Sequence, residues 1–159
     1  MVAMQFSDLA GRGPWDLAFD EARAAALRGE LPVGAVIVEA GRVLARAGNR
    51  TRELKDPSAH AEILAIRAAC ALKASERLPQ AELYVTLEPC TMCAGAISFS
   101  RIRRLYYAAS DPKGGAVESG VRFFASPACH HRPETYGGFR ESEAAALLKS
   151  FFADKRAPH

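Results

Sequence analysis

Five residues near the middle of the chain have types and spacings suited to metal chemistry. Cys90 and Cys93 follow Pro89 in the sequence Pro-Cys-Thr-Met-Cys, and His60 precedes Glu62 by two positions. Cysteines three residues apart in the first turn of a helix can direct both sulfurs toward one point, and a helix N-terminus favours the thiolate form that binds metals. One histidine and two cysteines make a three-ligand zinc site whose fourth position is left for water.

Such a site predicts a hydrolytic enzyme. Zinc in this environment lowers the pKa of its bound water to about 7, which provides a hydroxide nucleophile at neutral pH. Attack on an amidine-like ring carbon and loss of ammonia then require several proton transfers, which one carboxylate beside the metal can carry out. Glu62 has the sequence position for that role.

The segments around these residues must bring two helix starts together. Residues 83–87 are apolar and rich in β-branched and aromatic types, which predicts a strand that ends before Pro89. A helix at 94–99 follows, so the cysteines lie where a strand passes into a helix. A second helix is expected from about Ala59, with His60 in its first turn.

Periodicity along the rest of the chain predicts a layered α/β domain with a mixed sheet. The lead-in at residues 1–13 is expected to be irregular. Strands are predicted at residues 33–39, 43–47, 83–87, 104–109 and 135–139, the first two forming a hairpin around Ala40-Gly41. Helices are predicted at residues 14–29, 59–73 and 94–99, with a helical turn at 117–123 and a C-terminal helix that includes Ala144, Leu147, Leu148, Phe151 and Phe152.

Length and composition set the remaining limits. At 159 residues we expect one domain spanning 1–159. The net charge of +3 is compatible with a polyanionic partner without requiring one. The Cys-x-x-Cys pair favours metal binding in a reducing compartment over disulfides. No secretory signal and no apolar run of about 20 residues is evident, so we expect a cytoplasmic protein that does not enter a membrane.

His-x-Glu followed by Pro-Cys-x-x-Cys is similar to the signature of zinc-dependent nucleobase deaminases. From Gly34 to about Arg156 the chain further resembles the bacterial tRNA-specific adenosine deaminases of the cytidine/deoxycytidylate deaminase superfamily. The stretches that carry the resemblance are Gly48-Asn49-Arg50, His60-Ala61-Glu62-Ile63, residues 83–97, residues 111–116, Leu147-Leu148 and Phe151-Phe152.

The resemblance implies a three-layer α/β/α fold with a mixed central sheet of about five strands, like that of cytidine deaminase. It also implies a homodimer with one zinc ion per subunit that converts adenosine to inosine at the wobble position of a tRNA anticodon. By the same resemblance Asn49 hydrogen-bonds the flipped base. The other implied substrate contacts are Val33, Leu87 and Pro89 around the base, the Ala61 and Cys90 amides, Asp111 and Lys113 on the anticodon loop, and Phe152 or its neighbour Phe151 at the entrance.

Two other functions fit the metal motif. The first is a deaminase of a free base or nucleoside, of the guanine or cytosine type, because the motif is shared across the superfamily. The second is a catalytically silent zinc-binding or RNA-binding subunit, which is expected if Cys129 or His130 closes the fourth metal position. An unligated Glu62 has no use in such a closed site and favours the enzyme.

Several residues also have ordinary structural interpretations. Asn49 and Asp111 fit turns, and the Phe151-Phe152 pair fits core packing. Cys70 lies on an apolar helical face and is expected to pack in the core. The remaining polar candidates are expected on the surface, where they are solvated or contact RNA phosphates: His130-His131 and the arginines at 101, 103 and 104.

Overall fold

A computed structural model describes residues 4–5 and 11–156 of the chain. Its centre is a mixed sheet with the order β1-β3-β2-β4-β5-β6 in the described residues. The strands are β1 (Met4–Gln5), β2 (Gly34–Glu39), β3 (Arg42–Gly48), β4 (Glu82–Leu87), β5 (Arg104–Ala109) and β6 (Glu134–Gly137). Strands β4, β5 and β6 are parallel, whereas β2 runs antiparallel to both β3 and β4.

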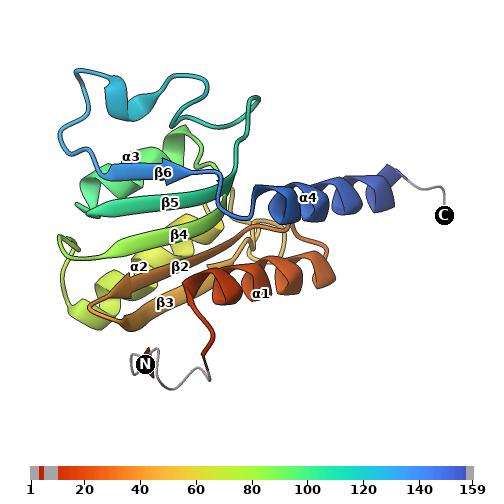
Figure 1. Cartoon of the computed structure of the whole chain (residues 1–159), viewed down its shortest axis with the longest axis horizontal. Coiled ribbons are helices and arrows are strands. Elements are labelled where there is room, and N and C mark those ends of the chain that lie inside the picture. Colours follow the sequence, from red (N-terminus) through yellow and green to blue (C-terminus); the bar gives the residue numbers. More distant parts are fainter. Residues whose placement is uncertain (1–3, 6–10, 157–159) are drawn as a thin grey trace.

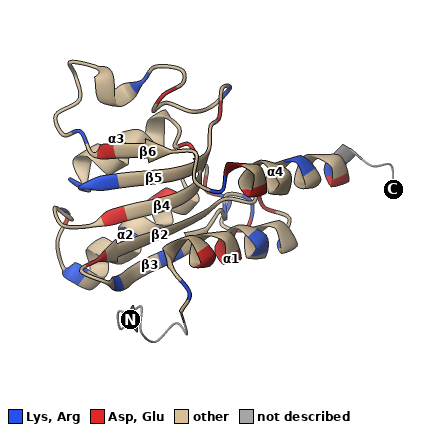
Figure 2. Ribbon diagram, viewed as in Figure 1, with Lys and Arg blue, Asp and Glu red and all other residues tan. Residues whose placement is uncertain are grey.

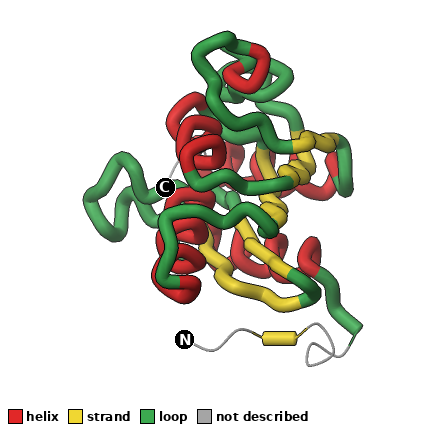
Figure 3. Tube along the Cα trace, turned by 90° about the vertical axis from the view of Figure 1, so that its left-hand side faces the viewer, coloured by secondary structure: helices red, strands yellow, loops and turns green. Residues whose placement is uncertain are grey.

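Helices cover both faces of this sheet (Figures 1 and 3). They are α1 (Pro14–Leu27), α2 (Ala61–Lys73), α3 (Thr91–Phe99) and α4 (Glu141–Arg156), with a short 3₁₀ helix η2 (Phe123–Ala125). Helices α2 and α3 contact each other on one face, and α1 and α4 contact each other on the opposite face. The three-layer α/β/α arrangement with a mixed sheet is therefore confirmed.

Helix α1 lies directly on β2. Pro14 occupies its first turn, and the Asp16 side chain accepts a hydrogen bond from the Gly13 amide at 3.0 Å. One face of α1 buries Phe19 and small residues such as Ala18. A Cβ atom at Gly34 would lie 1.9 Å from the Ala18 carbonyl oxygen, so only glycine permits this close approach.

The predicted hairpin turn is confirmed by the backbone angles. Ala40 and Gly41 have φ values of 49° and 74°, and positive φ at both central residues is typical of the type I′ turn that joins two right-twisted strands. The turn connects β2 to β3, and β2 is almost wholly buried, as its unbroken apolar sequence predicts.

The structure corrects three local predictions. Strand β1 lies within the segment expected to be irregular and pairs with β3 at the sheet edge; two residues carry too little pattern to be recognised. Helix α3 begins at Thr91, earlier than predicted. The predicted helical turn at 117–123 is wrong because the amides of Val117, Glu118 and Ser119 donate to the Glu88 carboxylate, and a 3₁₀ helix forms instead at Phe123–Ala125.

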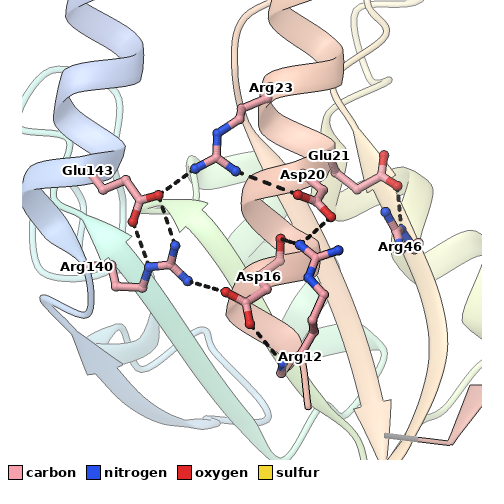
Figure 4. A network of polar contacts seen from close by, with 9 residues as sticks. Arg12, Asp16, Asp20, Glu21, Arg23, Arg46, Arg140 and Glu143 are labelled. Atoms are coloured by element: carbon pink, nitrogen blue, oxygen red, sulfur yellow. Dashed lines mark hydrogen bonds and ion pairs between the residues drawn. The ribbon is translucent and has the colours of Figure 1, made fainter. Parts of the chain in front are cut away.

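Ion pairs join the start of α4 to α1 (Figure 4). Arg140 donates to Glu143 at 2.7 Å and to Asp16 on α1 at 3.1 Å, and Arg23 on α1 donates to Glu143 at 2.6 Å. The Arg140 guanidinium also lies 4.3 Å from the centre of the Phe19 ring. Beyond these contacts α4 projects past the end of the sheet, with acidic and basic residues along it (Figures 1 and 2).

Candidate zinc centre

The three predicted ligands are positioned by two helix starts on the same face of the sheet. His60 is the N-cap of α2 and Cys90 is the N-cap of α3, both with extended backbone. Cys93 lies one turn into α3. Strand β4 ends at Leu87, and the next residues carry the chain to Cys90. Contact between α2 and α3 brings residues about thirty positions apart in the sequence to one point.

The distances among these side chains suit a tetrahedral zinc ion. His60 Nδ1 lies 3.7 Å from Cys90 Sγ and 3.6 Å from Cys93 Sγ, and all three atoms lie within 4.8 Å of one another. Bonds of about 2.0–2.1 Å to nitrogen and about 2.3 Å to sulfur, at tetrahedral angles, put these ligand atoms about 3.6 Å apart. The residues therefore fit the metal that the sequence predicts.

The environment favours the metal-binding protonation state at one of the three ligands, Cys90. A hydrogen bond from the Cys93 thiol lowers the pKa of Cys90 to about 4, so Cys90 is a thiolate at neutral pH. The same hydrogen bond, together with burial, raises the pKa of Cys93. Contact with Cys90 raises the pKa of His60. Thiolate is the form of cysteine that a metal binds.

Glu62 lies next to the ligands without joining them. It occupies the first turn of α2 and is only 4% exposed. Burial raises the pKa of its carboxyl. Among the described residues the metal-capable group contains His60, Cys90 and Cys93 alone, so the site has three protein ligands and a nearby unligated acid.

A pocket of about 310 Å³ opens onto this group. Four residues predicted to contact or line the substrate site are among its walls: Val33, Asn49, Leu87 and Asp111. Its other walls are Leu31, Thr51, His60, Glu62, Glu88, Cys90 and Gly114. Asn49 is 6% exposed, and its Nδ2 donates to Thr51 Oγ1 at 3.3 Å, which orients the amide.

A second cavity of about 530 Å³ adjoins the first. The two share Leu31, Leu87, Asp111 and Gly114, and the outer cavity adds Lys113 and Phe152. Phe152 on α4 is 46% exposed where it lines this outer cavity, and its place at a substrate entrance stays a prediction.

Two other predicted contacts, Ala61 and Pro89, are not among the walls of the zinc pocket. Ala61 is fully buried in the core between the sheet and α2. Pro89 is buried as well, and its carbonyl oxygen accepts a hydrogen bond from the Ala116 amide at 2.8 Å. Their side chains do not line the described pocket, and the main-chain contacts assigned to Ala61 and Cys90 stay predictions.

Two carboxylates beside the site, Glu88 and Glu30, are buried although the sequence does not predict it. Glu88 is 2% exposed, and hydrogen bonds from the Asp111, Ser119 and Val117 amides outweigh burial and keep its pKa below the usual value. Glu30 is 1% exposed and accepts from the Arg52 and Glu53 amides at 3.1 and 2.9 Å. Each carboxylate anchors a loop beside the pocket. The only sequence signal for Glu88 was its place between a strand and a metal ligand.

The proposed fourth ligands lie elsewhere. The Cys129 thiol donates to the His131 carbonyl oxygen at 3.0 Å, and Ser98 Oγ donates to the same oxygen at 2.8 Å. Neither Cys129 nor His130 belongs to the metal-capable group of the described residues. The closed, silent zinc site is therefore wrong for this fold.

A third cavity, of about 690 Å³, is not the chemical site. It lies at the starts of β5 and β6, whereas the zinc pocket lies beyond the carboxyl ends of β4 and β5. Its walls are Arg77, Pro79, Arg101, Arg103, His131, Arg132 and Glu134. None of the three zinc ligands and no cysteine is among them. These arginines form a basic surface at the opposite end of the sheet.

Comparison with known proteins gives the class first. Residues 15–109 match the family model of the cytidine and deoxycytidylate deaminase zinc-binding region. The match covers more than half of the chain and includes His60, Glu62, Cys90 and Cys93, so the chain belongs to this zinc-binding deaminase family.

Individual relatives narrow the class. The chain is 67% identical over 141 residues to the tRNA-specific adenosine deaminase of Agrobacterium fabrum, covering 89% of this chain and 93% of that one. A solved structure from a study of A-to-I editing by tRNA:A34 deaminases at the wobble position aligns with a TM-score of 0.84 at 67% identity, covering 85% of this chain and 98% of that one. A guanine deaminase from Nitrosomonas europaea aligns with a TM-score of 0.72 at 26% identity, covering 88% and 83% of the two chains.

Proposed function

We propose that this protein is a zinc-dependent hydrolase that deaminates adenosine to inosine at the wobble position of a tRNA anticodon. The observation that carries the proposal is the open three-ligand group with the buried, unligated Glu62 beside it. The 67% identity to a tRNA-specific adenosine deaminase over most of both chains supports RNA as the substrate.

His60, Cys90 and Cys93 would hold the zinc ion, which would supply a Lewis acid that activates water. Glu62 takes one proton from that water and delivers it to the ring nitrogen, then takes the remaining hydroxyl proton as the carbon–nitrogen bond breaks and delivers it to the departing amine. Its burial keeps bulk water from competing for these protons. Release of ammonia and of inosine balances the reaction.

Asn49 orients the base. Its Nδ2 donates to Thr51, which leaves Oδ1 as an acceptor for a hydrogen bond from the substrate. Val33 and Leu87 supply apolar contacts for a base turned out of the stack. The Ala61 and Cys90 amides and the Pro89 main chain complete the proposed base contacts.

The outer cavity accommodates the rest of the anticodon loop. Lys113 offers a positive charge for a phosphate, Phe152 offers an aromatic face for stacking, and Asp111 offers an acceptor. A free base would fill the inner pocket and leave this adjoining space without a ligand. The two-cavity arrangement thus favours a polynucleotide.

The likeness to a guanine deaminase supports a second candidate, deamination of a free base. A purified sample offered an anticodon stem-loop and a panel of free guanine, cytosine and adenosine separates the two. Sequencing should detect inosine at the wobble position of the stem-loop, and ammonia release from the free compounds should stay at background. Turnover of a free base with none on the stem-loop would reverse the assignment.

A homodimer is part of the proposal. Met92 and Phe99 lie two turns apart on α3 and are 39% and 76% exposed, which forms an apolar stripe on a helix that carries two metal ligands. Phe99→Glu should shift the protein toward monomer in sedimentation velocity, with Arg67→Glu on exposed α2 surface as the matched control. An unchanged dimer in both variants would place the interface elsewhere.

We further propose that residues 1–159 form one cytoplasmic domain. The elements after the family match, β6 and α4, pack on the same sheet as those within it, which supports one domain. None of the helices in the described part of the chain has the length and apolar character to span a membrane.

A further inference from the structure

One buried carboxylate organises residues 111–119, a segment that contributes walls to both cavities. Glu88 Oε1 accepts hydrogen bonds from the Asp111 amide and from Ser119 Oγ, both at 2.9 Å. Its Oε2 accepts from the amides of Val117, Glu118 and Ser119, each at 3.0 Å. A single side chain thereby satisfies four main-chain donors and one hydroxyl, a concentration of hydrogen bonds that only an ionised carboxylate can accept.

The segment folds closely around this carboxylate. The Gly115 amide donates to the Asp111 carbonyl oxygen at 2.8 Å. A Cβ atom on Gly115 would lie 2.4 Å from Glu88 Cδ and 2.6 Å from the Asp111 carbonyl oxygen. Residues 111–119 contain no helix or strand, so their amides have no regular ladder to join, and those of residues 111 and 117–119 bond the Glu88 side chain instead.

The other side of the segment faces the proposed substrate. Asp111 and Gly114 line both cavities, and Lys113 lines the outer one. Asp111 Oδ1 accepts from the Lys113 and Gly114 amides at 3.2 and 3.0 Å, which fixes their position relative to the segment's first residue. Glu88 therefore fixes the position of Asp111, and through Asp111 that of Lys113, the residues that would contact RNA.

We propose that Glu88 is a positioning residue for RNA binding, holding residues 111–119 so that Asp111 and Lys113 face the anticodon loop. This rests on the proposed function. Because Glu88 acts through these neighbours, its loss removes binding contacts made away from the reacting atoms, and the effect falls on KM rather than on kcat.

The test is Glu88→Gln with the stem-loop as substrate. The carboxamide keeps the shape of the side chain, but its NH₂ group cannot accept the hydrogen bonds that one carboxylate oxygen accepts. KM should rise at least about 10-fold while kcat stays within about threefold. Zinc content should match that of the unmodified protein, and amide hydrogen exchange at residues 111 and 117–119 should accelerate.

A second variant and a control make the test independent of folding. Gly115→Ala leaves the carboxylate unchanged but adds a Cβ atom that must displace the segment from Glu88. This variant should also raise KM, and it tests the inference if Glu88→Gln fails to fold. Ser98→Ala removes the buried anchor of a different loop, at the His131 amide and carbonyl. It should lower stability without changing the KM for the stem-loop.

An unchanged KM in both Glu88→Gln and Gly115→Ala would overturn the inference. Loss of zinc and of kcat in Glu88→Gln would also overturn it, because that result would assign Glu88 to the metal site. Turnover of the stem-loop by the unmodified protein tests the proposed function separately. If Asp111→Ala alone leaves KM unchanged while Glu88→Gln raises it, the positioning role stands and the contact assigned to Asp111 is removed.

Discussion

The two helical layers on either side of the sheet are held in different ways. Helices α2 and α3 bury a continuous core that includes Ala65, Ala94 and Ile97, and their starts carry the metal ligands and Glu62. Helices α1 and α4 share a smaller buried cluster that includes Phe19 and Ala144, and they are also joined at the surface by ion pairs such as Arg140–Asp16. The chemistry thus lies on the layer fixed by burial, whereas the layer that carries Phe152 depends partly on contacts exposed to water.

This difference predicts a graded response to substitution. Changes in the α2–α3 layer should abolish the reaction, because a zinc site and a proton carrier tolerate little displacement. Changes in the α1–α4 layer should weaken substrate binding or stability and leave the chemistry intact. The following variants test that gradient.

The largest effect is expected for Cys93→Ser. Cys93 is fully buried and is one of three ligands, and a serine hydroxyl is a poor substitute for a thiolate on zinc. Zinc content should fall well below one per chain, and inosine formation should be lost. Elemental analysis and stem-loop turnover on the same sample measure both. The matched control is Cys70→Ser on α2, outside the metal group, which should keep zinc and activity.

Glu62→Gln should lower kcat by about 100- to 10,000-fold, the range expected when a general acid–base group is removed. Because Glu62 is not a ligand, zinc content and the unfolding temperature should stay close to those of the unmodified protein. Single-turnover ammonia release gives the rate. A variant that keeps its rate would show that another group carries the protons.

Phe152→Ala tests the α1–α4 layer at the outer cavity. Loss of one base-stacking contact is expected to weaken RNA binding by about 1–3 kcal/mol, seen as a higher KM for the stem-loop with kcat unchanged. Phe139→Ala, an exposed aromatic outside the cavity, is the control. Equal effects of the two substitutions would assign Phe152 to packing alone.

The smallest effect is expected at the ion pairs between α1 and α4. A hydrogen bond from the Gly13 amide lowers the pKa of Asp16 below 3.8, and one from Arg140 lowers that of Glu143 below 4.5. Lowered pKa values stabilise the fold above those ordinary values, and the contribution is lost as the pH falls through the folded-state values. Arg140→Ala should therefore cost less than about 1 kcal/mol near pH 7, because the groups are exposed.

Denaturant unfolding of Arg140→Ala and the unmodified protein at pH 7 and near pH 3 measures this dependence. The difference between the two proteins should shrink at the lower pH and in high salt. A difference that persists at low pH would mean that Arg140 acts mainly through its contact with the Phe19 ring.

The parts of the fold that the sequence predicts are those coded by neighbouring residues. The hairpin turn at Ala40-Gly41, the buried strands and the two helix starts with their metal ligands each follow from a short local pattern. The ligand group itself required only that a histidine at one helix start meet cysteines at another. Local motifs of this kind carry their own geometry.

What the sequence could not predict depends on distant partners. Glu88 bonds residues 23 to 31 positions away, and those bonds replace the helical turn that residues 117–123 would otherwise form. Glu30 anchors the loop after β3 across a similar separation. From sequence alone a glutamate is predicted to lie on the surface, because burying an unpaired charge costs free energy. Only the folded chain shows the amides that compensate for this cost.

The most direct test of the central claim is a zinc titration of chelated protein, followed by stem-loop deamination. An open three-ligand site beside Glu62 predicts activity that rises in proportion to bound zinc and levels off at one ion per chain. Full activity in the chelated protein, or no activity at one bound zinc per chain, would contradict it.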